Sequence, residues 1–202
     1  MKSSLILLVV LFSAGGAPTR TGLPVFEAKV VEREDPEEIA EWGTGCSFYC
    51  GSFTVSERAS SSLPRRGGLR YDAGRAHDSK LDTAWVEGED GDGVGEYLEY
   101  TIDPAPGQNL AVTGFTIFNG YRKSRELWRD NSRVRQLRMH IDGKPYALLN
   151  LKDAYNHQRV EVGEIELRKR IVIKFEILDV YKGAEYADTA ITEIELEGTG
   201  VH

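Results

Sequence analysis

The chain has 202 residues, of which 41% are hydrophobic and 28% are charged, and its formal net charge is −7. This length suits one globular domain with a sizeable core, and the composition is that of an ordinary folded protein. The acidic balance argues against nonspecific binding to nucleic acids or to anionic membranes, because both need a basic face.

The N-terminus has the pattern of an export signal. Lys2 precedes the apolar run Leu5–Phe12, and the small residues 13–17 follow it. The run is too short to cross a bilayer as a helix, so we expect residues 1–17 to be a removed signal peptide, with no transmembrane segment elsewhere. A buried N-terminal strand is the alternative. The expected location is secreted or periplasmic.

Residues 18–41 are expected to form an extended, charged lead-in with a short helix. Asp35 would cap one or two helical turns that begin at Pro36, and Gly43 would end them. Cys46 and Cys50 follow four positions apart, and an oxidising compartment favours joining them in a local structural disulfide. A metal site would need further Cys or His ligands nearby, and a redox pair more typically has two intervening residues.

The stretch from Ala76 to Trp85 has neither the alternation of a strand nor the apolar stripe of a helix. We expect an ordered loop, anchored by Trp85 and rich in the oxygen donors that a hard cation such as calcium prefers. The acidic, glycine-rich segment 87–96 lacks the downstream glutamate of an EF-hand, and its glycines do not open a helix after a strand. A flexible or tightly turned loop is expected there.

From Glu96 onward, short segments that alternate apolar and polar residues follow one another. The expected strands cover residues 98–102, 110–117, 137–141, 146–148, 160–167, 171–177 and 192–196. Gly114 is expected to mark a bulge, Asp142-Gly143 the turn of a hairpin, and residues 171–177 a central strand covered on both faces. This pattern predicts an all-β fold, an antiparallel β-sandwich, in one domain over residues 42–199.

Aromatic and polar residues gather in the loops, which carry function at one end of a sandwich. A ring can pack on the apolar C–H face of a sugar while amides and charges take its hydroxyls. We therefore predict a binding face made of Tyr121, Lys123, Trp128, Asn131, Arg133, Asp179, Tyr181, Lys182 and Asp188. The alternative for Trp128 and Tyr181 is that they anchor their loops onto the sandwich.

Two stretches resemble the discoidin, or coagulation factor V/VIII type C, family: Ala76-x-Asp78-x-x-x-Asp82-Thr83-Ala84-Trp85 and Ala190–Leu196. The chain is more closely similar to the discoidin-like translocation and glycan-binding domain of bacterial NAD glycohydrolases. That similarity rests on segments 46–51, 76–78, 84–88, 95–96, 119–121, 128–133, 142–144, 151–153, 179–183 and 188–189. It covers roughly residues 42–198 and implies a galactose-binding-like jelly-roll sandwich and, in many members, a structural calcium ion beside the sugar site.

Carried onto this sequence, the resemblance implies a set of calcium ligands. Asp78, Thr83 and Glu193 would supply side-chain oxygens, backbone carbonyls of the 78–84 loop would complete the shell, and Asp82 is a further carboxylate of that loop. Lys80 would repel the ion unless it points away, and a loop held by its own hydrogen bonds is the alternative. The resemblance does not bring NADase activity, because the catalytic domain would be a separate segment.

No catalytic arrangement stands out. The histidines show no metal or triad spacing, and the serines lack the glycines of a nucleophile elbow. Paired carboxylates such as Asp179 and Asp188 could in principle act in a glycosidase, but such pairs are common by chance in an acidic chain. The expected function is a secreted, non-catalytic glycan-binding module with calcium-stabilised loops. The alternative is a module that docks another protein or the cell envelope without sugar specificity.

Overall fold

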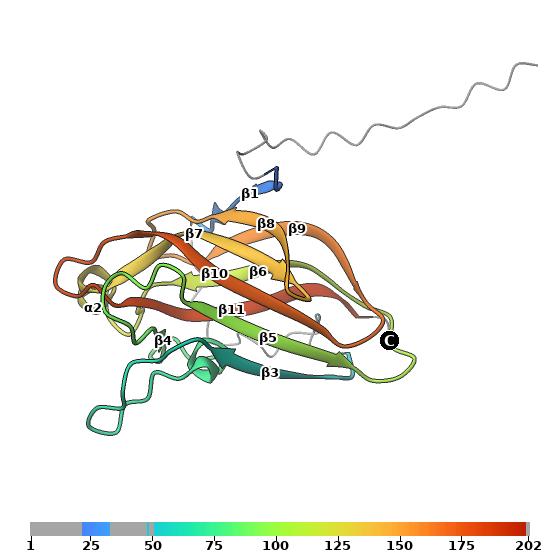
Figure 1. The fold of residues 1–202 in the computed structure, drawn as a ribbon, viewed down its shortest axis with the longest axis horizontal. Coiled ribbons are helices and arrows are strands. Elements are labelled where there is room, and N and C mark those ends of the chain that lie inside the picture. Colours follow the sequence, from blue (N-terminus) through green and yellow to red (C-terminus); the bar gives the residue numbers. More distant parts are fainter. Residues whose placement is uncertain (1–21, 33–47, 49–50, 201–202) are drawn as a thin grey trace, which may run out of the picture.

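The computed structural model describes residues 22–32, 48 and 51–200. The expected signal peptide, the expected helix after Asp35 and the expected Cys46–Cys50 disulfide lie outside these residues. The described part is built almost entirely of β strands (Figure 1). None of its helices combines the length and the apolar composition that crossing a bilayer requires.

The strands are β1 (Val25–Glu27), β2 (Lys29–Val30), β3 (Phe53–Ala59), β4 (Trp85–Val86), β5 (Tyr97–Pro104), β6 (Leu110–Asn119), β7 (Ser132–Ile141), β8 (Lys144–Asn150), β9 (Gln158–Leu167), β10 (Ile171–Tyr181) and β11 (Thr189–Gly200). The helical elements are the 3-10 turn η2 (Ala73–Ala76) and the helix α2 (Arg125–Asp130). All seven strands expected from alternation are present. The sequence does not predict the remaining elements, which are the strand β3, the short strands β1, β2 and β4, and the two helical elements.

The strands form two packed layers that β11 connects. One layer runs β3-β5-β10-β7-β8-β1 and the other runs β2-β9-β6-β11. β11 pairs antiparallel with β6 over Glu193–Gly200, whereas its first residues, Thr189 and Ala190, pair parallel with β7. This confirms the predicted β-sandwich, in which β1–β8 and β7–β11 are the parallel pairs of the described strands.

The main core lies between the layers, because alternate residues of each long strand point inward. The ring of Phe175 on β10 meets Phe115 on β6 edge to face, with 4.9 Å between centroids, and Tyr100 on β5 at 5.9 Å. Since β6 and β10 belong to different layers, the first of these contacts joins the two sheets. Trp85 is fully buried and its Nε1 donates to Ser61 O at 3.0 Å, which confirms its role as an anchor.

Three local predictions can be compared with the backbone. β10 is central, since it pairs with β5 on one side and β7 on the other, but its second face is only half-buried. The register between β6 and β9 shifts between Val112 and Gly114, as a bulge requires. Asp142 and Gly143 have φ angles of +48° and +76°, the left-handed pair that a tight type I′ hairpin turn needs.

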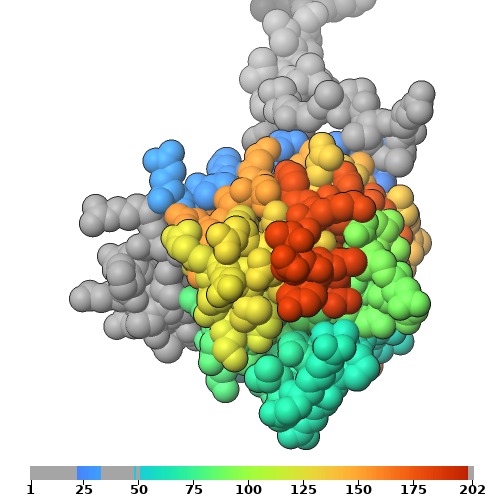
Figure 2. Space-filling model, turned by 90° about the vertical axis from the view of Figure 1, so that its left-hand side faces the viewer, coloured from blue at the N-terminus to red at the C-terminus, as the bar shows by residue number. Residues whose placement is uncertain are grey.

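The long connections gather at one end of the sandwich. Figure 2 shows this end, with the teal residues around 60–75 at its lower edge, the yellow segment 121–133 beside them and the red loop between β10 and β11 in the centre. The acidic loop 87–96 is tightly turned around buried Glu87, which accepts hydrogen bonds from Glu89 N at 2.9 Å and Thr189 N at 3.1 Å. Burial raises the pKa of Glu87.

Candidate ligand cavity and cation loop

A cavity of about 180 Å³ opens at the loop end, between the segment after β3, the α2 segment and the β10–β11 loop. We call it the tyrosine cavity, because Tyr71, Tyr121 and Tyr186 line it. Leu63, Val86 and Leu127 also line it and belong to a small apolar cluster separate from the main core. The wall of the cavity is therefore stabilised by its own packing.

The three tyrosine rings give the cavity aromatic surface. Tyr71 and Tyr121 meet edge to face, with 6.4 Å between centroids and an interplanar angle of 87°. Tyr121 is 7% exposed, and burial together with neighbouring Tyr71 and Asp82 raises its pKa. Tyr186 is 52% exposed, so its ring is available to a ligand. Two rings are therefore fixed and a third is accessible.

Polar groups complete the lining of the tyrosine cavity, namely Arg66, Asn131 and Asp188. Asn131 is 7% exposed, and its Nδ2 donates to Leu127 O at 2.8 Å, which fixes the orientation of the amide. Among the described residues, the Asn131 Oδ1, the Asp188 carboxylate and the Arg66 guanidinium have no hydrogen-bond or ion-pair partner. The cavity thus presents a cation, a carboxylate and an amide oxygen that the protein itself does not use.

Close backbone contacts place Tyr186 beside the end of α2. The Ser124 side chain caps the helix by accepting from Leu127 N at 3.1 Å. At the other end, Ala184 N donates to Arg129 O at 3.0 Å and Tyr186 N to Asp130 O at 2.8 Å. A Cβ on Gly183 would lie 2.2 Å from Asp130 O, so this approach requires glycine.

Tyr121, Asn131 and Asp188 are the predicted binding residues that line the tyrosine cavity. Trp128 and Arg133 lie in internal contacts instead: the Arg133 guanidinium stacks over the Trp128 ring at 4.6 Å, and Arg133 Nε donates to Asp153 at 2.8 Å. Trp128 Nε1 donates to Asn119 O at 2.9 Å. These contacts are those of an anchor for the 119–133 segment.

Asp179 and Tyr181 line a second, more polar cavity of about 290 Å³ whose charges are paired internally. Asp179 lies 3.2 Å from Arg135, and Tyr181 donates through its hydroxyl to Leu151 O at 3.2 Å. Lys182 pairs with Asp92 at 3.0 Å, and exposed Lys123 forms no ion pair within the described part. Asp179 and Asp188 therefore line different cavities.

The cation loop is the segment 78–83. Thr83 Oγ1 donates to Asp78 Oδ1 at 2.8 Å and lies 3.4 Å from Lys80 O, so three oxygens of the loop gather in one place. Arg75 holds the other oxygen of Asp78 at 2.9 Å. Asp82 is exposed, and its charge acts on Tyr121 of the tyrosine cavity.

Glu193 reaches the same loop from β11. Its Oε1 accepts from Asp78 N at 3.1 Å and Lys80 N at 3.2 Å, whereas its Oε2 is buried without a hydrogen-bond partner among the described residues. Burial, and then the charge of Glu195, raise the pKa of Glu193 to about 10. This shift favours the protonated form of the Glu193 carboxyl group when no ion is bound.

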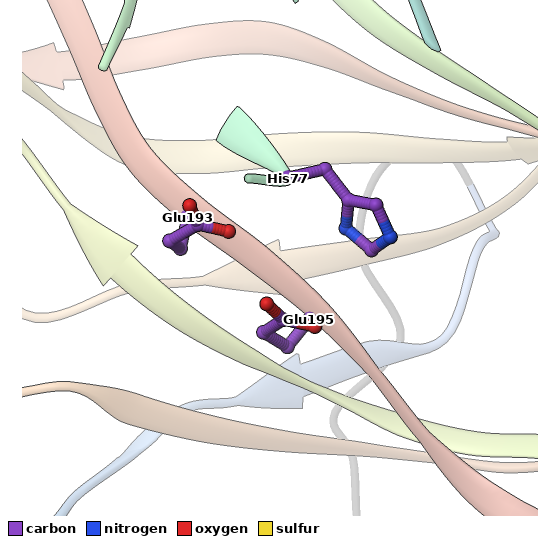
Figure 3. Close-up of side chains that lie close together, drawn as sticks. All are labelled: His77, Glu193 and Glu195. Atoms are coloured by element: carbon purple, nitrogen blue, oxygen red, sulfur yellow. The ribbon is translucent and has the colours of Figure 1, made fainter. Parts of the chain in front are cut away.

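Figure 3 shows Glu193 with Glu195 and His77, whose candidate ligand atoms all lie within 4.8 Å of one another. His77 Nδ1 lies 3.0 Å from Ile194 O and must carry the proton of that hydrogen bond, because a carbonyl only accepts. That nitrogen is thus a donor and not a metal ligand. The loop oxygens and the unpartnered Glu193 oxygen fit a hard cation, provided that Glu193 loses its proton.

Arg66, Tyr71, His77 and Glu195 are not among the residues predicted from the sequence, and Tyr186 is indicated only as a member of the loop segment 179–189. The Glu193-x-Glu195 spacing places two carboxylates on one side of a strand, which is a usable signal for that pair. Arg66 and Tyr71 lie in one segment, whereas Tyr186 lies in another that is distant in the sequence, and no local pattern relates the two segments.

Comparisons with known proteins agree with this architecture. The family model of the NAD glycohydrolase translocation F5/8 type C domain matches residues 48–197. No curated protein matches the chain.

Solved structures share the fold at low sequence identity. The CBM32-1 and CBM32-2 domains of Clostridium perfringens ZmpB align with a TM-score of 0.53 and 9% identity, covering 86% of this chain and 41% of that one. The C-terminal domain of a Bacteroides fragilis chitobiase aligns with a TM-score of 0.50 and 18% identity, covering 74% and 95%. CpGH89CBM32-5 from C. perfringens, solved with GalNAc-β-1,3-galactose, has a TM-score of 0.48 and 16% identity, covering 71% and 94%. At such identities the similarity extends to the fold alone.

Proposed function

We propose that this chain, which belongs to the NAD glycohydrolase translocation F5/8 type C domain family, is a non-catalytic module that binds a glycan in the tyrosine cavity. The observation that carries the proposal is the combination of three tyrosine rings with polar groups that the protein leaves unused. A sugar needs both, an aromatic surface for its C–H face and polar partners for its hydroxyls.

The size of the tyrosine cavity favours the end of a glycan. At about 180 Å³ it is smaller than pockets for drug-sized ligands, which occupy about 300–1,000 Å³. We therefore assign to it a terminal sugar, with the rest of the glycan outside. In a translocation domain, this binding would attach the module to a glycosylated surface.

Calcium in the cation loop is the second part of the proposal. Asp78, Thr83 and Glu193 would hold the ion together with Lys80 O, and the ion would supply positive charge that keeps both carboxylates ionised. The loop leads directly into Ala84 and Val86, which pack in the wall of the tyrosine cavity. Ordering the loop would therefore stabilise the cavity without contact between ion and sugar.

Asp188→Asn and Tyr186→Ala are each expected to weaken glycan binding about tenfold, because each removes one of the accessible groups of the tyrosine cavity. A glycan array would identify the ligand, and isothermal titration calorimetry would measure the affinities. The matched controls are Asp179→Asn and Tyr181→Phe, which alter the same residue types in the second cavity. They are expected to leave the affinity unchanged.

Two results would contradict this assignment. Loss of binding in the controls but not in Asp188→Asn would move the ligand to the second cavity. Capture of a protein partner that competing sugars do not displace, with no binding on the array, would favour the docking module instead.

A further inference from the structure

We propose that the terminal sugar carries a carboxylate and that Arg66 binds this group. The proposal rests on the glycan-binding function proposed above and specifies the chemical class of the ligand. Arg66 is the only cationic residue among those that line the tyrosine cavity.

A tight turn fixes the position of Arg66. Arg66 N donates to Leu69 O at 3.2 Å, and Leu69 N donates to Arg66 O at 2.8 Å. Gly67 and Gly68 between them have φ angles of +54° and +95°, which glycine adopts without strain. The backbone of Arg66 is thus held at the mouth of the cavity, and the long side chain extends from a defined place.

Among the described residues the guanidinium of Arg66 has no internal partner, in contrast to three other arginines of the chain. Arg70 in the same segment pairs with Asp72 at 2.9 Å, Arg75 with Asp78 at 2.9 Å and Arg133 with Asp153 at 2.8 Å. Within the described part, Arg66 forms no such pair, although the chain is acidic and Asp188 lines the same cavity. The N–H groups of its planar guanidinium therefore remain available, and two of them can donate parallel hydrogen bonds to the two oxygens of a carboxylate.

Opposite charges in one cavity orient the ligand. A carboxylate would be attracted to Arg66 and repelled by Asp188, whereas sugar hydroxyls can donate to Asp188 and to Asn131 Oδ1. A ligand that pairs with Arg66 and also donates to Asp188 and Asn131 needs a carboxylate at one end and hydroxyl groups at the other. The sugar ring between them would pack against the tyrosine rings. A uronic acid or a sialic acid has this arrangement, whereas a neutral hexose offers the exposed Arg66 guanidinium no anionic partner.

Pairs of sugars that differ only in the acid test the proposal. Titration calorimetry on the full chain would compare glucuronate with glucose, galacturonate with galactose, and N-acetylneuraminate with its methyl ester, at constant ionic strength. At least one acid is expected to bind about tenfold more tightly than its neutral counterpart, the usual scale of a charge-assisted fork. Arg66→Gln should remove this preference and retain binding of the neutral sugar, and Arg66→Lys should restore only part of it.

Arg65→Gln is the matched control, since Arg65 is the adjacent exposed arginine, forms no ion pair among the described residues and does not line the cavity. It should keep the acid preference. Equal affinities for every acid and its neutral counterpart, or a preference that survives Arg66→Gln, would overturn this proposal and leave the glycan-binding function standing. No binding of any sugar, acidic or neutral, would overturn that function and this inference with it.

Discussion

Calcium is expected to raise the melting temperature of the chain at neutral pH, and Glu193→Gln is expected to abolish that rise. Glu193 Oε1 accepts from Asp78 N and Lys80 N of the 78–83 loop, Oε2 of the same carboxyl group is buried without a partner among the described residues, and an amide in its place cannot supply the negative charge that calcium needs. At a calcium concentration 100 times the dissociation constant, the free energy of unfolding should rise by about 2.7 kcal/mol.

The raised pKa of Glu193 predicts how the calcium-free stability depends on pH. The folded-state pKa of about 10 lies above the ordinary value of 4.5, so folding favours the protonated form. Protonated Glu193 makes its full contribution to the free energy of unfolding below pH 4.5, the ordinary pKa of the group. As the pH rises from there toward the folded-state pKa, this contribution decreases by about 1.4 kcal/mol per pH unit. Glu193→Gln has no proton to lose, so at pH 7 it should be more stable than the wild type by up to about 3 kcal/mol.

Thermal unfolding between pH 5 and 8, with calcium or with a chelator, would measure both effects. Asp78→Asn should also lose the calcium response, whereas Glu161→Gln should keep it, because Glu161 is exposed on β9 and pairs with exposed Lys29. Calcium affinity should increase with pH, since binding displaces the Glu193 proton. If saturating calcium does not change the melting temperature of the wild type, the proposed calcium site is excluded. If the melting temperature of Glu193→Gln still rises with calcium, the ion binds at another site.

Gly183→Ala is expected to weaken glycan binding by on the order of a hundredfold. A Cβ at this position would lie 2.2 Å from Asp130 O and 2.6 Å from Tyr186 O, and both are backbone atoms that cannot rotate away. The β10–β11 loop would have to shift, which removes Tyr186 and Asp188 from the cavity together. Crowding of this kind should also cost about 1–3 kcal/mol of stability.

Gly74→Ala provides the control for the glycine substitution. A Cβ at Gly74 would meet only Asp72 Oδ1 at 3.5 Å, an ordinary contact, so affinity and stability should stay close to the wild type. Calorimetric titration with the glycan identified on the array, together with thermal unfolding, would compare the two variants. Unchanged affinity in Gly183→Ala would show that the β10–β11 loop takes no part in binding.

Several features of the fold follow from the sequence because they depend on near neighbours. Alternation of apolar and polar residues indicates the strands from β5 to β11, since successive side chains in a strand point to opposite faces. Asp142-Gly143 predicts its hairpin because few residue pairs tolerate two left-handed φ angles. In β3 the alternation of apolar and polar residues is weak, because Phe53 and Val55 are followed by Glu57 on the same face. Two-residue strands such as β4 are too short to show any alternation.

The candidate site was only partly predictable. The sequence indicates that the 119–133 and 179–188 segments carry unusual residues, and Tyr121, Asn131 and Asp188 do share a cavity. Sequence alone cannot distinguish Trp128, which stacks under Arg133, from Tyr186, which is 52% exposed, because both are aromatic residues in loops. The difference arises from partners such as Asp153 and Asp130, which are placed by packing elsewhere in the chain.

For the stretch from Ala76 to Trp85, too, the sequence determines some properties and the tertiary structure decides others. Its residue types determine an ordered loop with oxygen donors and a buried indole, because these are properties of a short segment. Only the tertiary structure decides that Glu193 reaches this loop, that the charge of Asp82 helps to raise the pKa of Tyr121, and that Arg66 comes to line a cavity with Asp188. Local periodicity determines the strands of this protein, whereas its sites depend on how the two layers pack and bring distant loops to one end.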